Sequence, residues 1–548
     1  MKIILIIIDY TLTNFFYKIK EVIKSSLKNF LNYKNIRDKK KFIKSSLNFL
    51  NSWGKPNNFR VNEKNVLIDC MWNNPNYWFR YVLVRNSLKL YQSNQFAIFG
   101  QYSINLEHLI CKTFNFKSLG SLFNRSKPKI NDLKVAIKLM REVKNSNDFL
   151  NIELPYSFPA SVLYDGILKK QHKATIDLSD QKITYYLAEC ISYLHKANAL
   201  INKYKFSLIL LSHCQEYTYA SLAWLATQKN IPVYVLYGEF GTCRFFYLSK
   251  PNDIFAYPSR PNSDQIKLIP SKKKNIFISE GKKLIKDRFQ GKSDDPGSLL
   301  AFVERNVPID KLRICERYNW LFNKPIIGVY CSNWFDYPHG SGLKTYTDFK
   351  DWICSVINAA RVNDSVNWLF KSHPCDKIYP SLKGETINDL LDNLNLDHIK
   401  IASEEWTGID LIKSLDGITT CHGTIGFEAT ILKKPVLVPY SGWYADLGFV
   451  QKASGKKNYL KILNSKWYLK KPTDSQIELC AISSAIYFGK PAWQKFVFED
   501  DIYQDRIYKK LKQNIINYDK ELKKEISVLK SWFKSKTKYY QVYKKINY

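Results

Sequence analysis

Residues 417–439 read GITTCHGTIGFEATILKKPVLVP, and this stretch decides the fold class. Residues 417–420 are short and apolar enough for a buried strand, and a turn around Gly423 follows them. Residues 425–432 have the composition of a helix, and 435–439 form a second apolar strand. A strand, a turn, a helix and a strand in such close succession predict a β-α-β unit of a parallel sheet.

Units of the same kind extend outward from this stretch on both sides. After Pro325 we expect further strands at 326–331, 366–372 and 398–402, and further helices at 346–360, 387–393 and 408–414. Earlier in the chain we expect strands at 65–69, 206–212 and 232–237, and a helix at 217–228. The sequence therefore predicts an α/β fold with two Rossmann-like domains facing a cleft, where the carboxyl ends of the strands bind ligands.

The same patterns predict five segments along the chain. They are a basic amphipathic helical segment at 1–60, a first Rossmann-like domain at 61–258, an inter-domain connection at 259–324, a second Rossmann-like domain at 325–502 and a basic helical tail at 503–548.

The positive charge of the chain lies mostly at its two ends. The net charge is +34, but only 14 of the 83 basic residues are Arg, the residue that nucleic-acid readers favour. Residues 1–60 carry 13 basic and 3 acidic residues, and 503–548 carry 13 and 4. We therefore expect no nucleic-acid partner. The ends either touch the anionic inner membrane, pack on the domains, or reflect a Lys-rich composition.

Several classes of site are disfavoured by the motifs that the sequence lacks. Eleven Cys without a CxxC pair indicate reduced thiols in a cytoplasmic protein and give no zinc spacing. The chain has no Asp-x-Asp pair, GxGxxG, Walker loop or G-x-S-x-G elbow. The apolar run Ile3–Ile8 ends at Asp9, too early for a signal peptide, and no apolar stretch is long enough to span a membrane. We expect no metal.

The strongest local signal is the turn between residues 420 and 429. A small turn that leads into a helix presents backbone N–H groups, so His422, Gly423 and Thr424 form a candidate phosphate site. Glu428 follows in the first helical turn, where it either benefits from the helix dipole or accepts hydrogen bonds from ribose hydroxyls.

The second signal is WLFKSHP at 368–374. Strand alternation places Lys371 and His373 on one side of the strand end, where a cation and an imidazole suit a nucleotide phosphate. A Lys at a strand end followed by a loop capped by Asp376 would show the same pattern. The loop at 333–340, NWFDYPHG, is the third signal. Its aromatic residues and Asp336 fit either a loop that stacks on a sugar or base, or a surface turn.

In the first half, Glu216 and Glu239 each follow a predicted strand. They are candidates for the general base that activates an acceptor hydroxyl. Acidic residues that simply stand at the start of a helix would give the same sequence pattern.

Taken together, "WLFKSHP" and "HGTIGFEATILKKPVLV" resemble the capsule polysaccharide biosynthesis glycosyltransferases, which include the capsular Kdo transferases. "NVLIDCMWNNPNYWFRYVLVRNSL" is similar to the N-terminal domain of surface-carbohydrate members, so the resemblance covers roughly residues 62–500. It implies a GT-B fold in which Lys371, His373, His422, Gly423 and Thr424 hold the donor phosphate and Glu428 contacts its sugar or ribose. Where most relatives have Gly before Lys-Pro, this chain has Lys433.

The resemblance implies a metal-independent glycosyltransferase of a surface glycan, capsular or lipopolysaccharide. The first domain would hold a glycan or lipid-linked glycan acceptor, and the second a CMP-, UDP- or GDP-linked sugar as co-substrate, with no other cofactor. The catalytic candidates are Glu239, Glu216 and Asp336. Two alternatives remain open: another GT-B-fold enzyme, such as a nucleotide-sugar epimerase or a glycerophosphate-type transferase, and a non-enzymatic basic scaffold that docks on membranes or polyanions.

Overall fold

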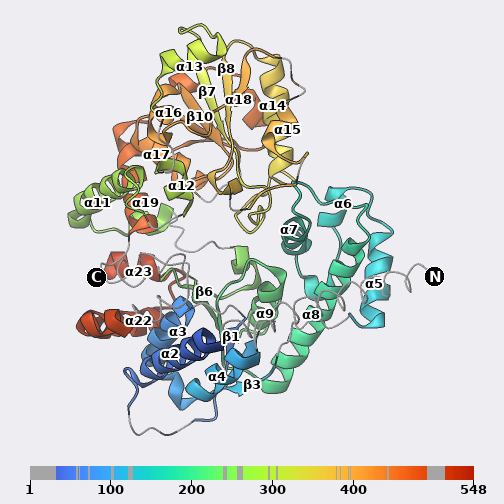
Figure 1. The fold of residues 1–548 in the computed structure, drawn as a ribbon, viewed down its shortest axis with the longest axis vertical. Helices are drawn as coiled ribbons and strands as arrows, with labels where there is room; N and C mark the ends of the chain where they lie inside the picture. The colour runs from blue at the N-terminus through green and yellow to red at the C-terminus, as the bar shows by residue number, and fades with distance from the viewer. Residues whose placement is uncertain are drawn as a thin grey trace.

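The computed structural model describes residues 33–489 and 512–548, apart from short gaps at 57–59, 61, 72–74, 100–103, 121–127, 238–242, 256–262, 294–295, 304–306, 378, 383, 393, 395 and 441–443. These residues form two α/β domains, one above the other along the long axis (Figure 1). The predicted fold class is therefore confirmed. Residues 1–32 of the basic N-terminal segment and the candidate base Glu239 lie outside the described residues.

The first domain is built on a six-stranded sheet in the order β3-β2-β1-β4-β5-β6. Its strands are β1 (Asn65–Cys70), β2 (Asn94–Phe99), β3 (Lys117–Ser118), β4 (Leu208–Leu211), β5 (Val233–Val235) and β6 (Phe246–Leu248). All pairs are parallel except β5 with β6. The strand order reverses between β1 and β4, which opens a crevice at their carboxyl ends.

Eight of the helices that the structure describes precede β5 in this domain. They are α2 (Tyr33–Ser52), α3 (Pro75–Leu88), α4 (Ile104–Phe114), α5 (Ile130–Met140), α6 (Ser146–Leu150), α7 (Ala160–Gln171), α8 (Lys182–Tyr204) and α9 (Tyr217–Gln228). The sequence predicts β1, β4, β5 and α9 but not β2, β3 or β6. β2 opens on the polar pair Asn94-Gln95, and β3 and β6 are too short to show a pattern.

The central strands are buried on both faces of the sheet. In β1, Leu67 belongs to a core cluster that continues into the second domain, whereas Val66 and Ile68 belong to a separate cluster on the opposite face. Successive side chains of a strand point to opposite faces, so a strand that is apolar throughout needs a cover on each side.

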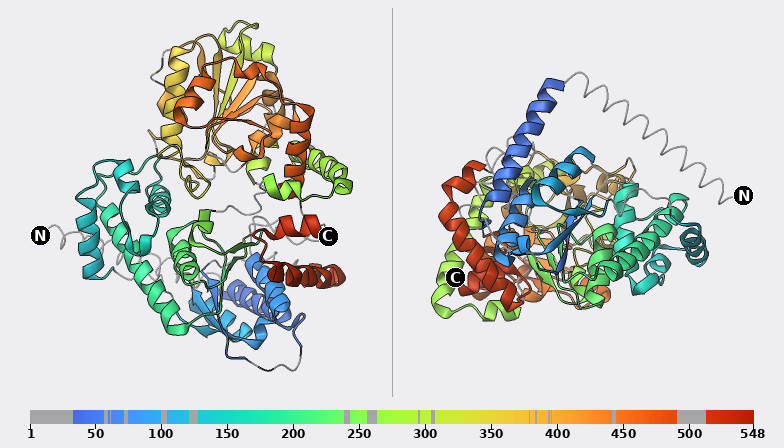
Figure 2. Two further views of the ribbon diagram at one scale, coloured as in Figure 1. Left: turned by 180° about the vertical axis from the view of Figure 1, so that it is seen from behind. Right: turned by 90° about the horizontal axis from the view of Figure 1, so that it is seen from below.

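The basic ends of the chain provide part of the cover on that opposite face. Helices α22 (Asp519–Ser535) and α23 (Tyr540–Asn547) return to the first domain, and α22 packs against α3 (Figure 2). Leu47 of α2, and Leu529 and Trp532 of α22, are fully buried in the same cluster as Val66. The apolar faces of these basic helices therefore contact the first sheet.

The second domain repeats the strand order of the first. Its sheet runs β12-β11-β10-β7-β8-β9, with every pair parallel. The strands are β7 (Ile326–Tyr330), β8 (Asn367–Lys371), β9 (Ile399–Ile401), β10 (Gly417–Thr420), β11 (Val436–Val438) and β12 (Gln451–Lys452). The order reverses between β7 and β10, so the crevice of this domain opens at their carboxyl ends.

The helices of this domain are α14 (Phe349–Val362), α15 (Ile387–Leu391), α16 (Gly408–Ser414), α17 (Ile425–Ile431), α18 (Lys456–Leu463) and α19 (Asp474–Phe488). The first four were expected from the sequence. Helix α14 begins three residues later than predicted because Asp348 is its N-cap, and the Asp348 carboxylate accepts the N–H of Asp351 at 2.8 Å.

The segment expected to connect the domains holds α10 (Ser263–Lys267), α11 (Ser271–Phe289), α12 (Pro296–Phe302) and α13 (Lys311–Tyr318). Helix α11 packs along α19 and against α17, and α12 contacts α16. Much of the connection thus covers the second sheet. Gly281 allows the close approach of α11 to α19, because a Cβ there would lie 1.8 Å from the carbonyl oxygen of Ala481.

Candidate active site

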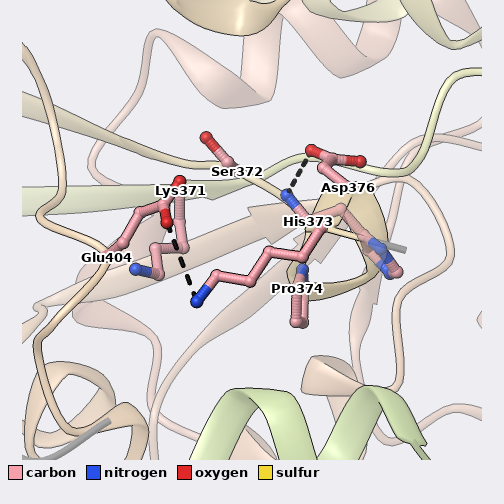
Figure 3. A pocket seen from close by; sticks show the side chains of 7 residues that line it. Lys371, Ser372, His373, Pro374, Asp376 and Glu404 are labelled. Atoms are coloured by element: carbon pink, nitrogen blue, oxygen red, sulfur yellow. Dashed lines mark hydrogen bonds and ion pairs between the residues drawn. The ribbon is translucent and has the colours of Figure 1, made fainter. Parts of the chain in front are cut away.

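A pocket of about 130 Å³ lies at the carboxyl end of β8 in the second domain. It is lined by Lys371, Ser372, His373, Pro374, Asp376, Lys377 and Glu404. Figure 3 shows Lys371 and Glu404 toward one end and His373 and Asp376 toward the other. The structure thus brings Lys371 and His373 together at the strand end where the sequence placed them.

Lys371 is the last residue of β8 and is largely buried, with 7% of its surface exposed. Its Nζ donates to the carbonyl oxygen of Ser403 at 2.8 Å. A buried ammonium costs desolvation energy unless it is well hydrogen-bonded, and this carbonyl fixes its position beside the pocket. Lys377, at the exposed rim, adds a second cation 4.0 Å from Glu404.

The backbone around His373 is held by Asp376. The Asp376 carboxylate accepts the N–H of His373 at 3.1 Å and the side-chain amide of Asn333 at 2.9 Å. Burial raises the pKa of this carboxyl to about 6. The N–H of Cys375 donates to His373 Nδ1 at 3.2 Å, so a neutral ring carries its proton on Nε2. His373 can therefore donate a hydrogen bond to an anion from Nε2.

The turn at 421–424 follows β10, two strands away from β8 in the sheet. Strands lie about 4.8 Å apart, so the two strand ends are separated by about 10 Å, a span that suits a nucleotide diphosphate. The turn is fixed by two bonds: the N–H of Gly423 donates to Thr420 Oγ1 at 3.3 Å, and Tyr444 donates to the Gly423 carbonyl at 2.7 Å.

Two neighbours shape this turn further. The ring of His422 stacks on Phe349 at the start of α14, with centroids 4.8 Å apart and planes 15° from parallel. Gly426, at the start of α17, packs so closely against Tyr444 that a Cβ there would lie 2.3 Å from the Tyr444 hydroxyl oxygen. A residue with a side chain would therefore not fit at this position. The stacking fixes the plane of the His422 ring.

Glu428 has a partner that the sequence does not reveal. It is almost fully buried, and one of its oxygens accepts from Arg288 Nε at 3.1 Å and from Nη2 at 2.9 Å. Arg288 comes from α11, its Nη2 lies 3.5 Å from Thr424 Oγ1, and its guanidinium covers the ring of Phe488 at 4.4 Å. Arg288 thus links the connecting segment to the 421–424 turn. No pattern around residue 288 signals this role.

One prediction for the 333–340 loop was an exposed aromatic surface that stacks on a sugar or base. Its aromatic residues do not form such a surface. Trp334, Phe335 and Tyr337 are buried, because the loop packs against α7 of the first domain. His339 Nδ1 lies 2.7 Å from Asp165 Oδ1, and the N–H of Gly340 donates to the same carboxylate at 2.9 Å. Asp336 remains exposed.

Further bonds join the domains beside this loop. Tyr164 and Thr175 of the first domain both donate to Asp348, at 2.7 and 2.8 Å. The N–H of Ala174 donates to Glu385 at 3.2 Å. These contacts join α7 and the segment that follows it to the start of α14 and to Glu385 in the second domain.

Glu216 and His213 follow β4 in the first domain. Burial raises the pKa of Glu216, while Lys170 and Lys169 act against that shift, and Thr218 donates to its carboxylate at 2.9 Å. The centroid of the His213 ring lies 6.0 Å from that of the Tyr337 ring in the second domain. Its pKa is lowered to about 4 by burial and by Lys169, so it is neutral at pH 7.

Asp69, which was not among the candidate residues, lies at the point where the strand order of the first sheet reverses. It is fully buried near the end of β1 and accepts the N–H of Ser212 at 2.9 Å and that of Met71 at 2.6 Å, with a further short bond from the Ser212 hydroxyl. Burial raises its pKa to about 6. In the sequence, the sign of this residue is a single Asp near the end of an otherwise apolar strand.

Within the part of the chain that the structure describes, no three His, Cys, Asp or Glu side chains are grouped closely enough to hold a metal ion. None of the helices in that part is both long and apolar enough to cross a bilayer.

One family of known proteins matches part of the second domain. Residues 344–471 match the model of a family described as capsule polysaccharide biosynthesis protein. This segment contains Lys371, His373 and the turn with His422 and Glu428. The resemblance to this family is therefore confirmed over these residues. The chain matches none of the curated proteins.

Several solved structures are similar to the chain. The beta Kdo 2,4 transferase KpsC of Thermosulfurimonas dismutans is 17% identical with a TM-score of 0.33, over 51% of this chain and 79% of that one. The UDP-GlcNAc 2-epimerase of Neisseria meningitidis, bound to UDP-GlcNAc, is 12% identical with a TM-score of 0.23, over 83% and 100%. The corresponding enzyme of Methanocaldococcus jannaschii is 13% identical with a TM-score of 0.25, over 76% and 97%.

Proposed function

We propose that this chain, which matches the capsule polysaccharide biosynthesis family over residues 344–471, is a glycosyltransferase that moves a sugar from a nucleotide-activated donor to a surface glycan. One observation carries the proposal. Lys371, His373 and the His422 turn lie along the carboxyl edge of one sheet, after β8 and β10, inside the segment that matches the family. The donor would be a CMP-, UDP- or GDP-linked sugar.

The donor phosphate would bind between the ends of β8 and β10. The Lys371 ammonium and His373 Nε2 would approach it from β8, and His422, Gly423 and Thr424 from β10. When the bond between the sugar and the phosphate breaks, the departing phosphate gains negative charge. Positioned donors and a cation stabilise that charge, so they accelerate the step without requiring a metal.

Glu428 would contact the ribose or sugar of the donor. Arg288 donates to its Oε1 at 2.9 and 3.1 Å and acts as a positioning residue for this carboxylate.

Glu216 is our first choice for the general base. It follows β4 in the first domain, and its raised pKa makes it a better proton acceptor. It would take the proton of the acceptor hydroxyl while the oxygen forms the new bond to the sugar. Glu239 and Asp336 are the other candidates.

The basic helices would attach the protein to the anionic inner leaflet from the cytoplasmic side. Their apolar faces pack on the first domain, so the contact would be made by exposed lysines such as Lys523, Lys530 and Lys534. Each lysine near such a surface contributes about 1 kcal/mol at low salt.

Calorimetric binding of CMP-, UDP- and GDP-sugars tests the donor site. We expect one class to bind, and His373→Ala and His422→Ala each to weaken binding about tenfold to a hundredfold, because a hydrogen bond to a charged group contributes about 1.5–3 kcal/mol. His108→Ala, an exposed histidine of the first domain, is the control and should bind as the wild type does. The proposal fails if no nucleotide sugar binds, or if both site variants keep wild-type affinity.

A further inference from the structure

We propose that His213 binds the acceptor glycan by donating a hydrogen bond from its Nε2 to a hydroxyl oxygen of a sugar ring. The inference rests on the glycosyltransferase function proposed above and adds a first-domain residue that contacts the acceptor. His213 comes two residues after β4 ends at Leu211. In sheets of this kind ligands bind at the carboxyl ends of the strands beside the reversal of strand order, which falls between β1 and β4 here.

The backbone fixes which nitrogen of the His213 ring carries the proton. The N–H of Gln215 donates to Nδ1 at 3.0 Å, so a neutral ring has its proton on Nε2. Burial and the charge of Lys169 lower the pKa of His213 to about 4, so the ring is neutral at pH 7. Both nitrogens are then committed, Nδ1 as an acceptor and Nε2 as a donor. His213 in this state is therefore a hydrogen-bond donor and not a general base.

The donor at Nε2 is not used within the described part of the protein. His213 is half-buried, and none of the described residues forms a hydrogen bond with its Nε2. Polar groups that are shielded from solvent normally have a hydrogen-bond partner. A ligand oxygen would supply that partner.

Tyrosine rings surround this imidazole from both domains. The ring centroids of Tyr219 and Tyr237 lie 5.6 and 5.8 Å from that of His213, and that of Tyr337 in the second domain lies 6.0 Å away. A sugar ring has an apolar face of C–H groups that packs on aromatic rings, and hydroxyls that accept hydrogen bonds. Since Tyr337 belongs to the other domain, the site lies where the domains meet. An acceptor bound there approaches the domain that would hold the donor.

His373 of the donor pocket has the same ring arrangement in a different setting. Its Nδ1 accepts the N–H of the residue two positions later, Cys375, at 3.2 Å. It shares its pocket with Lys371 and Lys377, and these cations suit a phosphate. His213 stands among tyrosine rings instead, and an anion would favour a protonated ring, which burial opposes. We therefore assign a sugar hydroxyl to His213, and not an anionic group.

Histidine-selective ¹⁵N NMR with the methyl glycosides of glucose, galactose, mannose and N-acetylglucosamine tests the site. The signals of His213 are assigned by their absence in His213→Gln. We expect them to show the Nε2–H form at pH 7 and to shift when at least one of these glycosides is added. His108, an exposed histidine of the same domain, is the control and should not shift. A ring protonated on Nδ1, or signals that none of the four glycosides moves, would overturn the proposal.

Affinities of the variants separate this bond from a structural role. His213→Phe should bind the glycoside about two- to tenfold more weakly, which is the effect of losing one hydrogen bond between neutral groups. His213→Gln retains an N–H donor and should stay close to the wild type. His108→Phe is the matched control, and urea midpoints show whether each variant is folded.

Three results would contradict the assignment to the acceptor. They are an unchanged glycoside affinity in His213→Phe, equal losses in His213→Phe and His213→Gln, and a loss of nucleotide-sugar affinity in His213→Phe. Failure of the wild type to bind any nucleotide sugar would instead overturn the proposed function, whether or not a glycoside shifts the His213 signals.

Discussion

The two domains have the same strand order, but their sheets are covered in different ways. Among the described residues, four of the helices around the second sheet (α14, α15, α16 and α17) lie between its strands in the chain, and α11, α18 and α19 complete the cover from adjacent segments. The first sheet depends on both ends of the chain, since α2 and α22 bury Leu47 and Trp532 against one of its faces. A parallel sheet needs both faces covered, and the cover can come from any part of the sequence.

The domains also differ in how each stabilises a buried carboxylate near its crevice. In the second domain Glu428 pairs with the Arg288 guanidinium. In the first domain Asp69 accepts hydrogen bonds from a hydroxyl and two N–H groups, and burial raises its pKa. The first arrangement suits a site that must keep its charge, and the second holds β1 and β4 together.

Replacing Trp532 by Ala should cause the largest loss of stability, and it tests whether the first sheet needs its C-terminal cover. The side chain is fully buried and contacts the ring of Tyr234 at 5.3 Å, so the cavity should cost about 3–5 kcal/mol of stability. Urea denaturation with hydrogen exchange should locate the loss in β1, β4 and β5. Lys530→Ala, an exposed position of the same helix, is the control. A loss below about 0.5 kcal/mol would mean that the first domain is complete without its C-terminal helices.

Arg288→Met should destabilise the second domain next most strongly. It leaves Glu428 buried without its partner, which should cost about 3 kcal/mol, at the lower end of the usual range because the carboxyl can take up a proton. Adding Glu428→Gln should recover much of the loss, since no buried charge then remains. Lys286→Met on the exposed side of α11 serves as the control. If the double variant is no more stable than Arg288→Met, the ion pair is not the cause.

Asp69→Asn should change stability least of the three variants. The difference in the free energy of unfolding between the variant and the wild type should depend on pH. The folded pKa of about 6 lies above the ordinary value, so the wild type binds an extra proton when folded and loses stability as the pH rises from about 4 to 6. Relative to the variant, the wild type should lose about 2–3 kcal/mol over this window. Urea midpoints at pH 4, 5, 6 and 7 measure it, with the exposed Asp397→Asn as control. If the urea midpoints of the wild type and of Asp69→Asn change by the same amount with pH, Asp69 does not have the raised pKa.

Local patterns explain why the second domain was easier to predict. Its strands alternate with helices in short units, and Lys371, His373 and the 421–424 turn follow strands directly, so their place at the sheet edge follows from the chain direction. In the first domain the strand β1 and its neighbour β4 are separated by more than a hundred residues, and β2 has polar residues at its start. Its strand order could not be derived from local periodicity.

The sequence by itself determined the α/β class, the two domains and the positions of Lys371, His373 and His422 at strand ends, because these depend on residues close together in the chain. Only the tertiary structure decided the partners that come from distant segments: Arg288 for Glu428, Asp165 for His339, and Lys169 beside Tyr379. It also decided that the basic terminal helices cover the first sheet. Such contacts are selected by packing and charge pairing in three dimensions, and no local pattern in the sequence encodes them.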